Sequence, residues 1–255
     1  MNGNGKAYLA EFIGTFTLVF IGCATVWVTT TPGYAAGPIV PAFGHGLAIV
    51  FAAYSLGHIS GAHLNPAVTL SCAIYGAISW PKAVGYWITQ ILAGLVAALA
   101  LSFIIPNQAA NFGGFSFGTN TTFAGAVLME MILTFFLCTA VLQGAVAGKA
   151  GQFAGLAIGL TLTLSILGGG AITGASLNPA RTLGPAIVAS MGGLSTALSQ
   201  VPAYLIGTLL GGAIAAVIHR YVLNVPAPVS NAELPRTQAS TAPRMETPRS
   251  KGSRR

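Results

Sequence analysis

The sequence predicts an all-α membrane protein with six transmembrane helices and two re-entrant half-helices, arranged as an inverted repeat. Three observations lead to this prediction. The 255-residue chain is 54% hydrophobic and 6% charged, with a mean hydropathy of +0.75. Six apolar stretches are long enough to cross a bilayer. Two shorter apolar stretches begin with the same tripeptide, Asn65-Pro66-Ala67 and Asn178-Pro179-Ala180.

The composition excludes a soluble domain, in which about a quarter of the residues are charged. Lipid is therefore the expected solvent for most of the chain. The net charge of +7 does not indicate a nucleic-acid partner, because six of the eleven Lys and Arg residues lie between Arg236 and Arg255. Residues 224–255, rich in Pro, Ser, Thr and Arg, are expected to form a disordered basic tail.

A transmembrane helix needs about 20 apolar residues. The predicted spans are residues 7–29, 40–59, 83–105, 123–146, 152–169 and 199–223. The segments 66–77 and 179–190 are too short to span, because a helix of about ten residues rises roughly 15 Å, half of the hydrocarbon core. They are predicted to be half-helices.

The chain contains an internal repeat. The windows 60–70 and 173–183 are identical at eight of eleven positions, at an offset of 113 residues, and the Glu-bearing segments 10–16 and 129–135 are also similar. Each half, about 7–105 and 123–223, therefore has three spans. Because three is odd, the second half enters the membrane from the opposite side, which predicts an inverted repeat.

Charge placement predicts the orientation. The connections 30–39 and 106–122 carry no Lys or Arg, whereas the opposite ends of the spans are flanked by Lys6, Lys82, Lys149 and Arg220. The positive-inside rule then places both termini in the cytoplasm. We expect a multi-pass protein of the cell (plasma or inner) membrane rather than of an organelle membrane.

The Asn-Pro-Ala motifs suit helix starts. Asn caps the first-turn amides, and Pro at the next position has no N–H to leave unpaired. Asn65 and Asn178 are thus expected to cap half-helices whose positive dipole ends meet near the midplane, with their carboxamide NH₂ groups free to donate into a lumen. Arg181 adds a full charge on the first turn of the second half-helix, and a charge at this depth is usually functional.

The remaining intramembrane polar residues receive mainly supporting roles. Glu11 and Glu130 occupy equivalent places in the repeats, and we expect their carboxylates to accept hydrogen bonds from the re-entrant loops. His58 and His63, placed in the first loop, are candidate partners. His45, inside the second span, is expected to line a cavity. No spacing of Cys or His indicates a metal site, and we expect no cofactor and no catalytic residues.

Together these motifs, with Gly57–His63 and Ala10–Phe20, resemble the aquaporin (major intrinsic protein) family over about residues 6–223. The resemblance implies an aquaporin-like channel domain over residues 1–223 and a cytoplasmic tail over 224–255. It also implies a right-handed helical bundle, one pore in each protomer, and a homotetramer.

The resemblance also implies a four-residue selectivity filter, located by spacing from the motifs at His45, Ile166, Ala175 and Arg181. This set is most similar to the plant vacuolar (tonoplast) subfamily. Water channels typically have Phe, His, Cys or Thr, and Arg there, and glycerol channels have Trp, Gly, Phe and Arg. Without the bulky aromatic residue, the constriction should be somewhat wider. Leu205 departs from the Trp that water channels usually carry.

The sequence favours a passive channel for water and small neutral solutes, with ammonia, hydrogen peroxide or urea as further passengers, and with ions and protons excluded. A glycerol-type facilitator is the alternative, disfavoured by Ala175 and by Thr182 and Ala186, which replace the Asp and basic pair of glycerol channels. An intramembrane enzyme would need a nucleophile–base or metal constellation. A coupled transporter would need a titrating acid in the lumen.

Overall fold

A computed structural model describes residues 3–31, 33, 37–105 and 116–223, and within these residues every regular element is helical. The predicted tail, 224–255, lies outside the described residues. Six helices are long and apolar enough to cross a membrane, as the sequence predicts. The spans are α1 (Gly3–Thr30), α2 (Ile39–Ser60), α4 (Trp80–Ile104), α5 (Phe123–Ala140) with the π-helix η1 (Val141–Val146), the 3₁₀ turn η2 (Gly151–Phe153) with α6 (Ala154–Thr173), and α8 (Ser195–Val217) with the π-helix η3 (Ile218–Val222).

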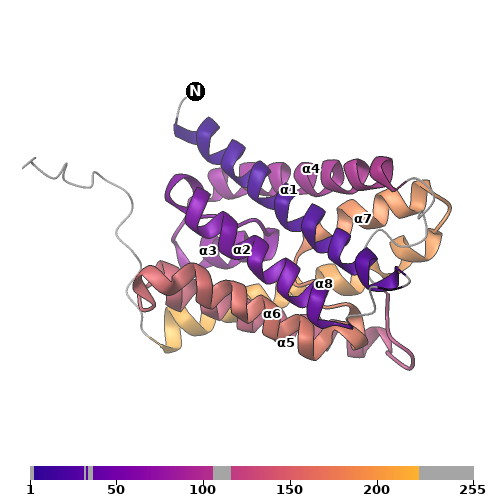
Figure 1. Cartoon of the computed structure of the whole chain (residues 1–255). Coiled ribbons are helices and arrows are strands. Elements are labelled where there is room, and N and C mark those ends of the chain that lie inside the picture. Colours follow the sequence, from indigo (N-terminus) through magenta and orange to yellow (C-terminus); the bar gives the residue numbers. More distant parts are fainter. Residues whose placement is uncertain (1–2, 32, 34–36, 106–115, 224–255) are drawn as a thin grey trace, which may run out of the picture.

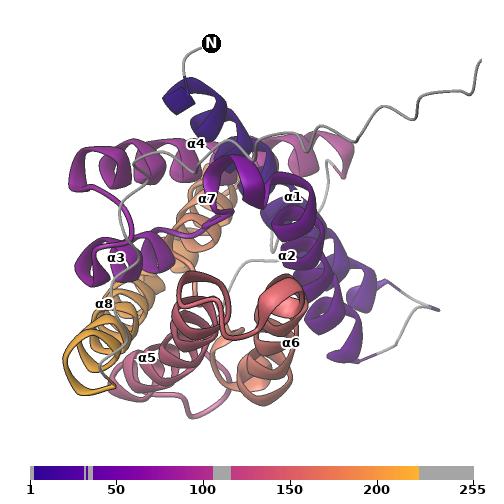
Figure 2. The ribbon, with the colours of Figure 1, turned by 90° about the vertical axis from the view of Figure 1, so that its left-hand side faces the viewer.

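The half-helices are α3 (Pro66–Tyr75) and α7 (Pro179–Met191), and they complete the wall of the bundle (Figures 1 and 2). Helix α1 packs between α2 and α4, and α6 joins α2 to α5, which packs along α8. Both α4 and α8 contact both half-helices. The half-helices therefore lie between the last span of the first repeat and the last span of the second.

The contacts of the half-helices are exchanged between the repeats. A Cβ atom on Gly94 of α4 would lie 2.5 Å from the Ala180 carbonyl oxygen of α7, and one on Gly212 of α8 would lie 2.6 Å from the Ala67 carbonyl oxygen of α3. Small residues allow such close backbone approach between helices in lipid. Each half-helix is thus held by the other repeat.

The boundaries of the spans differ from the prediction by up to four residues, at the starts of α1 and α8 and at the end of α6. Helix α6 continues through Gly168-Gly169-Gly170 to Thr173, four residues beyond the predicted end at 169. Glycine disfavours a helix, but packing overrides this preference: a Cβ on Gly169 would lie 2.4 Å from Leu133 Cδ1. The helix ends instead at Gly174, which has a φ of 76°.

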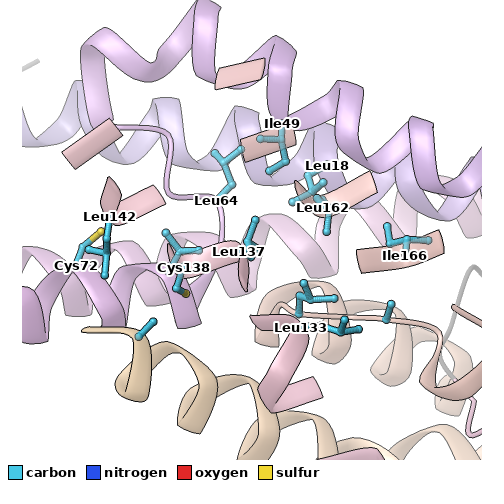
Figure 3. Packing of buried hydrophobic residues seen from close by; sticks show 14 of the residues in the cluster. Leu18, Ile49, Leu64, Cys72, Leu133, Leu137, Cys138, Leu142, Leu162 and Ile166 are labelled. Carbon is cyan, nitrogen blue, oxygen red and sulfur yellow. The ribbon is translucent and has the colours of Figure 1, made fainter. Parts of the chain in front are cut away.

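A cluster of buried apolar side chains lies inside the helical bundle, contributed by α1, α2, α3, α5, α6 and α8 (Figure 3). Leu64 and Leu177, from the two re-entrant segments, belong to it. The outer faces are also apolar, with large exposed side chains spaced four residues apart along the spans, as at Leu47 and Phe51, Ile88 and Leu92, and Leu160 and Leu164. Such faces suit lipid or neighbouring protomers.

We predict that Gly184→Ala lowers the stability of the folded protein by about 1–3 kcal/mol, a typical range for overpacking. Its Cβ would lie 2.4 Å from the carbonyl carbon and oxygen of Gly94, and neither backbone can move away easily. The measurement is thermal unfolding in detergent. Gly168→Ala is the matched control, because a Cβ there has nothing within 4 Å. Equal unfolding temperatures for the two variants would contradict the proposed packing constraint.

Candidate functional site

The two Asn-Pro-Ala motifs begin the half-helices. Asn65 has an extended backbone, and its Oδ1 accepts a hydrogen bond from the Ala67 amide at 2.8 Å. Asn178 repeats this geometry, with Oδ1 accepting from the amides of Ala180 at 2.9 Å and Arg181 at 3.3 Å. Both are N-caps in the conformation that favours a cap. The N-terminal ends of α3 and α7, with their positive dipoles, thus meet inside the bundle.

The side-chain amide nitrogen of each Asn connects the two loops. Asn65 Nδ2 donates to the Leu177 carbonyl at 2.7 Å, and Asn178 Nδ2 donates to the Leu64 carbonyl at 2.9 Å. The sequence analysis expected these NH₂ groups to be free for a lumen. An amide nitrogen has two hydrogens, so this cross-connection uses one and leaves one on each Asn.

The loops that lead into the half-helices have unusual backbone. The φ angles are 47° at Ala62 and 55° at Leu64, and 49° at Ala175 and 55° at Leu177. Positive φ is uncommon outside glycine, and each such residue costs about 1–3 kcal/mol, so the surroundings must hold it. Sequence analysis missed these conformations, because neither Ala nor Leu marks them.

The Glu11 carboxylate holds the first loop from α1. Its Oε1 accepts from Ser60 Oγ at 2.7 Å and from the His63 amide at 2.9 Å. Its Oε2 accepts from the Leu64 amide at 2.7 Å and from Gln90 Nε2 at 2.8 Å. The carboxylate thus receives four donors, two of them non-helical backbone amides that need partners at membrane depth.

Glu130 does the same for the second loop from α5. Its Oε1 accepts from Thr173 Oγ1 at 2.7 Å and from the Ser176 amide at 3.0 Å, and its Oε2 accepts from the Leu177 amide at 2.8 Å. A tyrosine hydroxyl also supports each loop. In the second loop, Tyr204 donates to the Thr173 carbonyl at 2.7 Å.

In the first loop, Tyr86 donates to the Ser60 carbonyl, also at 2.7 Å.

The two histidines near this loop differ in placement from the prediction. His58 lies in the last turn of α2 rather than in the loop, and it is exposed. His63 meets Glu11 through its backbone amide, whereas its ring Nδ1 lies 3.2 Å from Thr69 Oγ1.

His45 and Arg181 meet on the side of the motifs away from Lys82, Lys149 and Arg220. Arg181 Nε donates to His45 Nε2 at 2.6 Å, across 136 residues of sequence. His45 Nδ1 lies 2.7 Å from the Pro41 carbonyl, so it carries the ring proton and donates, and Nε2 is the acceptor. Both side chains are buried. Each ring nitrogen of His45 therefore has a partner within the protein.

Ile166 on α6 and Ala175 in the second loop are also buried, and they supply apolar surface at this level. Sequence analysis missed one further residue here, Gly22 on α1. A Cβ on Gly22 would lie 2.2 Å from His45 Nε2, so only glycine leaves room for the imidazole. Nothing in the sequence distinguishes Gly22 from the glycines that serve helix packing.

A cavity of about 580 Å³ leads to these groups. We call the end of the bundle near Lys82, Lys149 and Arg220 the basic end. The cavity is lined there by Lys82 and Gly148, passes Ser60 and His63, and reaches Asn65, Asn178 and Arg181. His45, Ile166 and Ala175 are not in its lining, so the cavity reaches Arg181 but not these three residues.

The chemistry of this cavity suits passage rather than reaction. Its inner end presents the remaining amide hydrogens of two Asn residues and a guanidinium, all donors that keep their bonds without titrating. Among the described residues, no three His, Cys, Asp or Glu side chains gather where they could hold a metal ion. The arrangement therefore offers hydrogen-bond donors and positive charge to whatever enters the cavity.

Comparisons with known proteins agree with this arrangement. The family model described as "Major intrinsic protein" matches residues 2–219. Aquaporin TIP2-3 of Arabidopsis thaliana is 39% identical over 84% of this chain and 86% of its own length. Aquaporin Z of Rhodopseudomonas palustris is 38% identical over 88% and 95%. The X-ray structure of the aquaglyceroporin from Plasmodium falciparum matches with a TM-score of 0.76 and 25% identity, over 86% of this chain and 97% of that one.

We predict that Glu11→Ala destabilises the protein more than Glu130→Ala does, because four donors lose their acceptor in the first variant and three in the second. A buried donor left unpaired costs about 1–3 kcal/mol. Folded yield and thermal unfolding in detergent measure the effect. Ile13→Val, on the exposed face of α1, is the control. Wild-type stability in both Glu variants would show that the loops do not depend on the carboxylates.

Proposed function

Because the chain belongs to the major intrinsic protein (aquaporin) family, we propose that it is a passive channel for water that excludes ions and protons. Family membership and the six apolar spans make it an integral multi-pass membrane protein. It is a transport protein rather than an enzyme.

The observation that carries the proposal is the reciprocal pairing of Asn65 and Asn178 at the inner end of the cavity. Each Asn is fixed by its cap and by the opposite loop, so its remaining amide hydrogen has a fixed direction. A water molecule that accepts from these donors exchanges one hydrogen bond for another as it passes. The two helix N-termini beside them place positive potential at the same point, which disfavours cations.

Arg181, His45, Ile166 and Ala175 form the proposed filter. Arg181 lies one helical turn from Asn178, so a cation meets the guanidinium and the half-helix dipoles together. Because both nitrogens of His45 are used, its role in the proposal is to fix the Arg181 side chain rather than to bind the passenger. Ile166 and Ala175 leave an apolar wall opposite, where few groups compete for the passenger.

The pairing of His45 with Arg181 holds two side chains together at the filter, which favours water over glycerol, although the constriction is expected to be wider than in water channels with a bulky aromatic residue there. Ammonia, hydrogen peroxide and urea are neutral and small enough to be further passengers. A glycerol-type facilitator is the second candidate, since one similar solved structure is described as an aquaglyceroporin. Water channels and glycerol channels both have an Arg at the position of Arg181, so this residue does not distinguish the two candidates. The width of the passage at His45 distinguishes them instead.

The orientation and assembly follow from charge and surface. We place the basic end in the cytoplasm, with both termini on that side, because the positive-inside rule applies to its Lys and Arg residues. We also propose the cell (plasma or inner) membrane as its location. Residues 1–223 form the channel domain, with 224–255 as its tail, and the exposed apolar faces serve lipid and a homotetramer.

Reconstitution tests the function directly. Proteoliposomes with the purified protein should shrink in an osmotic gradient many times faster than empty vesicles, and the same vesicles should retain a proton gradient. Glycerol uptake should stay near that of empty vesicles. Glycerol entry comparable to water entry would favour the second candidate, and no increase in water flux would exclude the proposed function.

For the filter, we predict that His45→Phe lowers ammonia or urea permeability more than water permeability, because a phenyl ring fills the constriction and offers Arg181 no acceptor. Arg181→Val should admit more urea or glycerol, because it removes the guanidinium from the passage. The measurement is solute flux divided by water flux on the same vesicles. His45→Gln, which keeps an acceptor for Arg181, is the control. If neither ratio moves, these residues do not form the filter.

A further inference from the structure

Two π-helical turns end neighbouring spans at the basic end of the bundle. Helix α5 continues into η1, where the Ala147 amide donates to the Leu142 carbonyl at 2.8 Å. Helix α8 continues into η3, where the Leu223 amide donates to the Ile218 carbonyl at 3.0 Å. Helices α5 and α8 pack along each other. Single π-turns in helices often occur at functional sites.

His219 links these two turns, although the sequence analysis gave it no role. The side chain is 2% exposed, and its Nδ1 lies 2.9 Å from Gln143 Nε2 of η1. Its Nε2 lies 3.2 Å from Thr139 Oγ1 on α5. An amide nitrogen only donates, so Nδ1 accepts, and Nε2 carries the proton and donates to Thr139. A single chain of hydrogen bonds therefore runs from Gln143 through His219 to Thr139.

The opposite face of η1 is a wall of the cavity. Val141, Gly144, Ala145 and Val146 line the cavity, whereas Gln143 is not part of its lining. The turn thus presents small apolar side chains to the cavity and one amide to α8. The position of η1 relative to η3 therefore determines where this wall of the cavity lies.

The residue after His219 fixes a second wall. Arg220 Nη1 donates to the Ile74 carbonyl at 2.5 Å, in the last turn of α3. The positive charge of Arg220 there also interacts favourably with the negative C-terminal end of the α3 dipole. Val68 of α3 lines the cavity. Consecutive residues of η3 therefore hold two different walls, η1 through His219 and α3 through Arg220.

We propose that His219 is a positioning residue for conduction: through Gln143 it fixes η1, and so sets the width of the cavity mouth at the basic end. The inference rests on the proposed channel function, and it concerns a part of the molecule distant from the filter. Without the hydrogen bond, η1 takes up positions in which Val141 and Val146 narrow the cavity. The rate of passage then falls, while selectivity, set at Arg181, does not change.

The test compares variants in proteoliposomes, with water permeability normalised to folded protein. His219→Phe keeps the ring and removes both bonds, and Gln143→Leu removes only the donor to the ring. We expect both to lower water permeability about fivefold, the change that one hydrogen bond of ordinary strength makes to an equilibrium. The ratio of glycerol to water flux should stay at the wild-type value. Because Gln143 is only partly buried, its variant decides the outcome where His219→Phe does not fold.

Two further variants separate positioning from stability. His219→Gln can accept from Gln143 and donate to Thr139, so it should recover most of the permeability. Tyr221→Phe, on the exposed side of the same turn, should match wild type. If Gln143→Leu and His219→Phe lower the unfolding temperature but conduct like wild type, the pair is structural and the proposal is overturned. If wild type itself conducts no water, it is instead the channel function that fails.

Discussion

The structure depends on supplying partners for non-helical backbone at membrane depth, where lipid offers none. The five-residue loops before α3 and α7 cannot satisfy themselves, so carboxylates from α1 and α5 accept their amides. The Asn side chains supply the remaining link, since each donates to a carbonyl of the other loop. The loops therefore form one unit, and neither half-helix can keep its position without the opposite repeat.

A symmetric scaffold carries an asymmetric passage. Asn, Glu and Tyr supports recur in both repeats with nearly equal distances, but the position of Arg181 is occupied by Val68 in the first repeat. The Arg181 guanidinium therefore lies on one side of the Asn pair, where His45 accepts from it. The inverted repeat provides the two opposed half-helices, and the difference between Val68 and Arg181 makes the charge around the Asn pair asymmetric. In the proposed channel, the dipoles are thus the symmetric part of the barrier to cations and the arginine is its asymmetric part.

The two ends of the cavity are controlled by different helices. At the inner end, α2 and α7 set the distance between His45 and Arg181, with Gly22 of α1 leaving room for the imidazole. At the basic end, the π-turns of α5 and α8 are joined through His219. These two sets of contacts share no residue, so in the proposed channel the filter and the mouth can be altered separately. The π-turn gives η1 one face for the cavity and another for α8.

The sequence alone determined the spans, the starts of the half-helices and the inversion, because these follow from local hydrophobicity, from Asn-Pro at a helix start, and from an odd number of spans per repeat. It also indicated which polar residues matter at depth. Only the tertiary structure decided their partners: the positive φ of Leu64, the donation from Asn65 to the opposite loop, and the bond between Gln143 and His219. These depend on packing between residues 53 to 112 positions apart, and no local pattern specifies which side chains that packing brings within hydrogen-bonding distance.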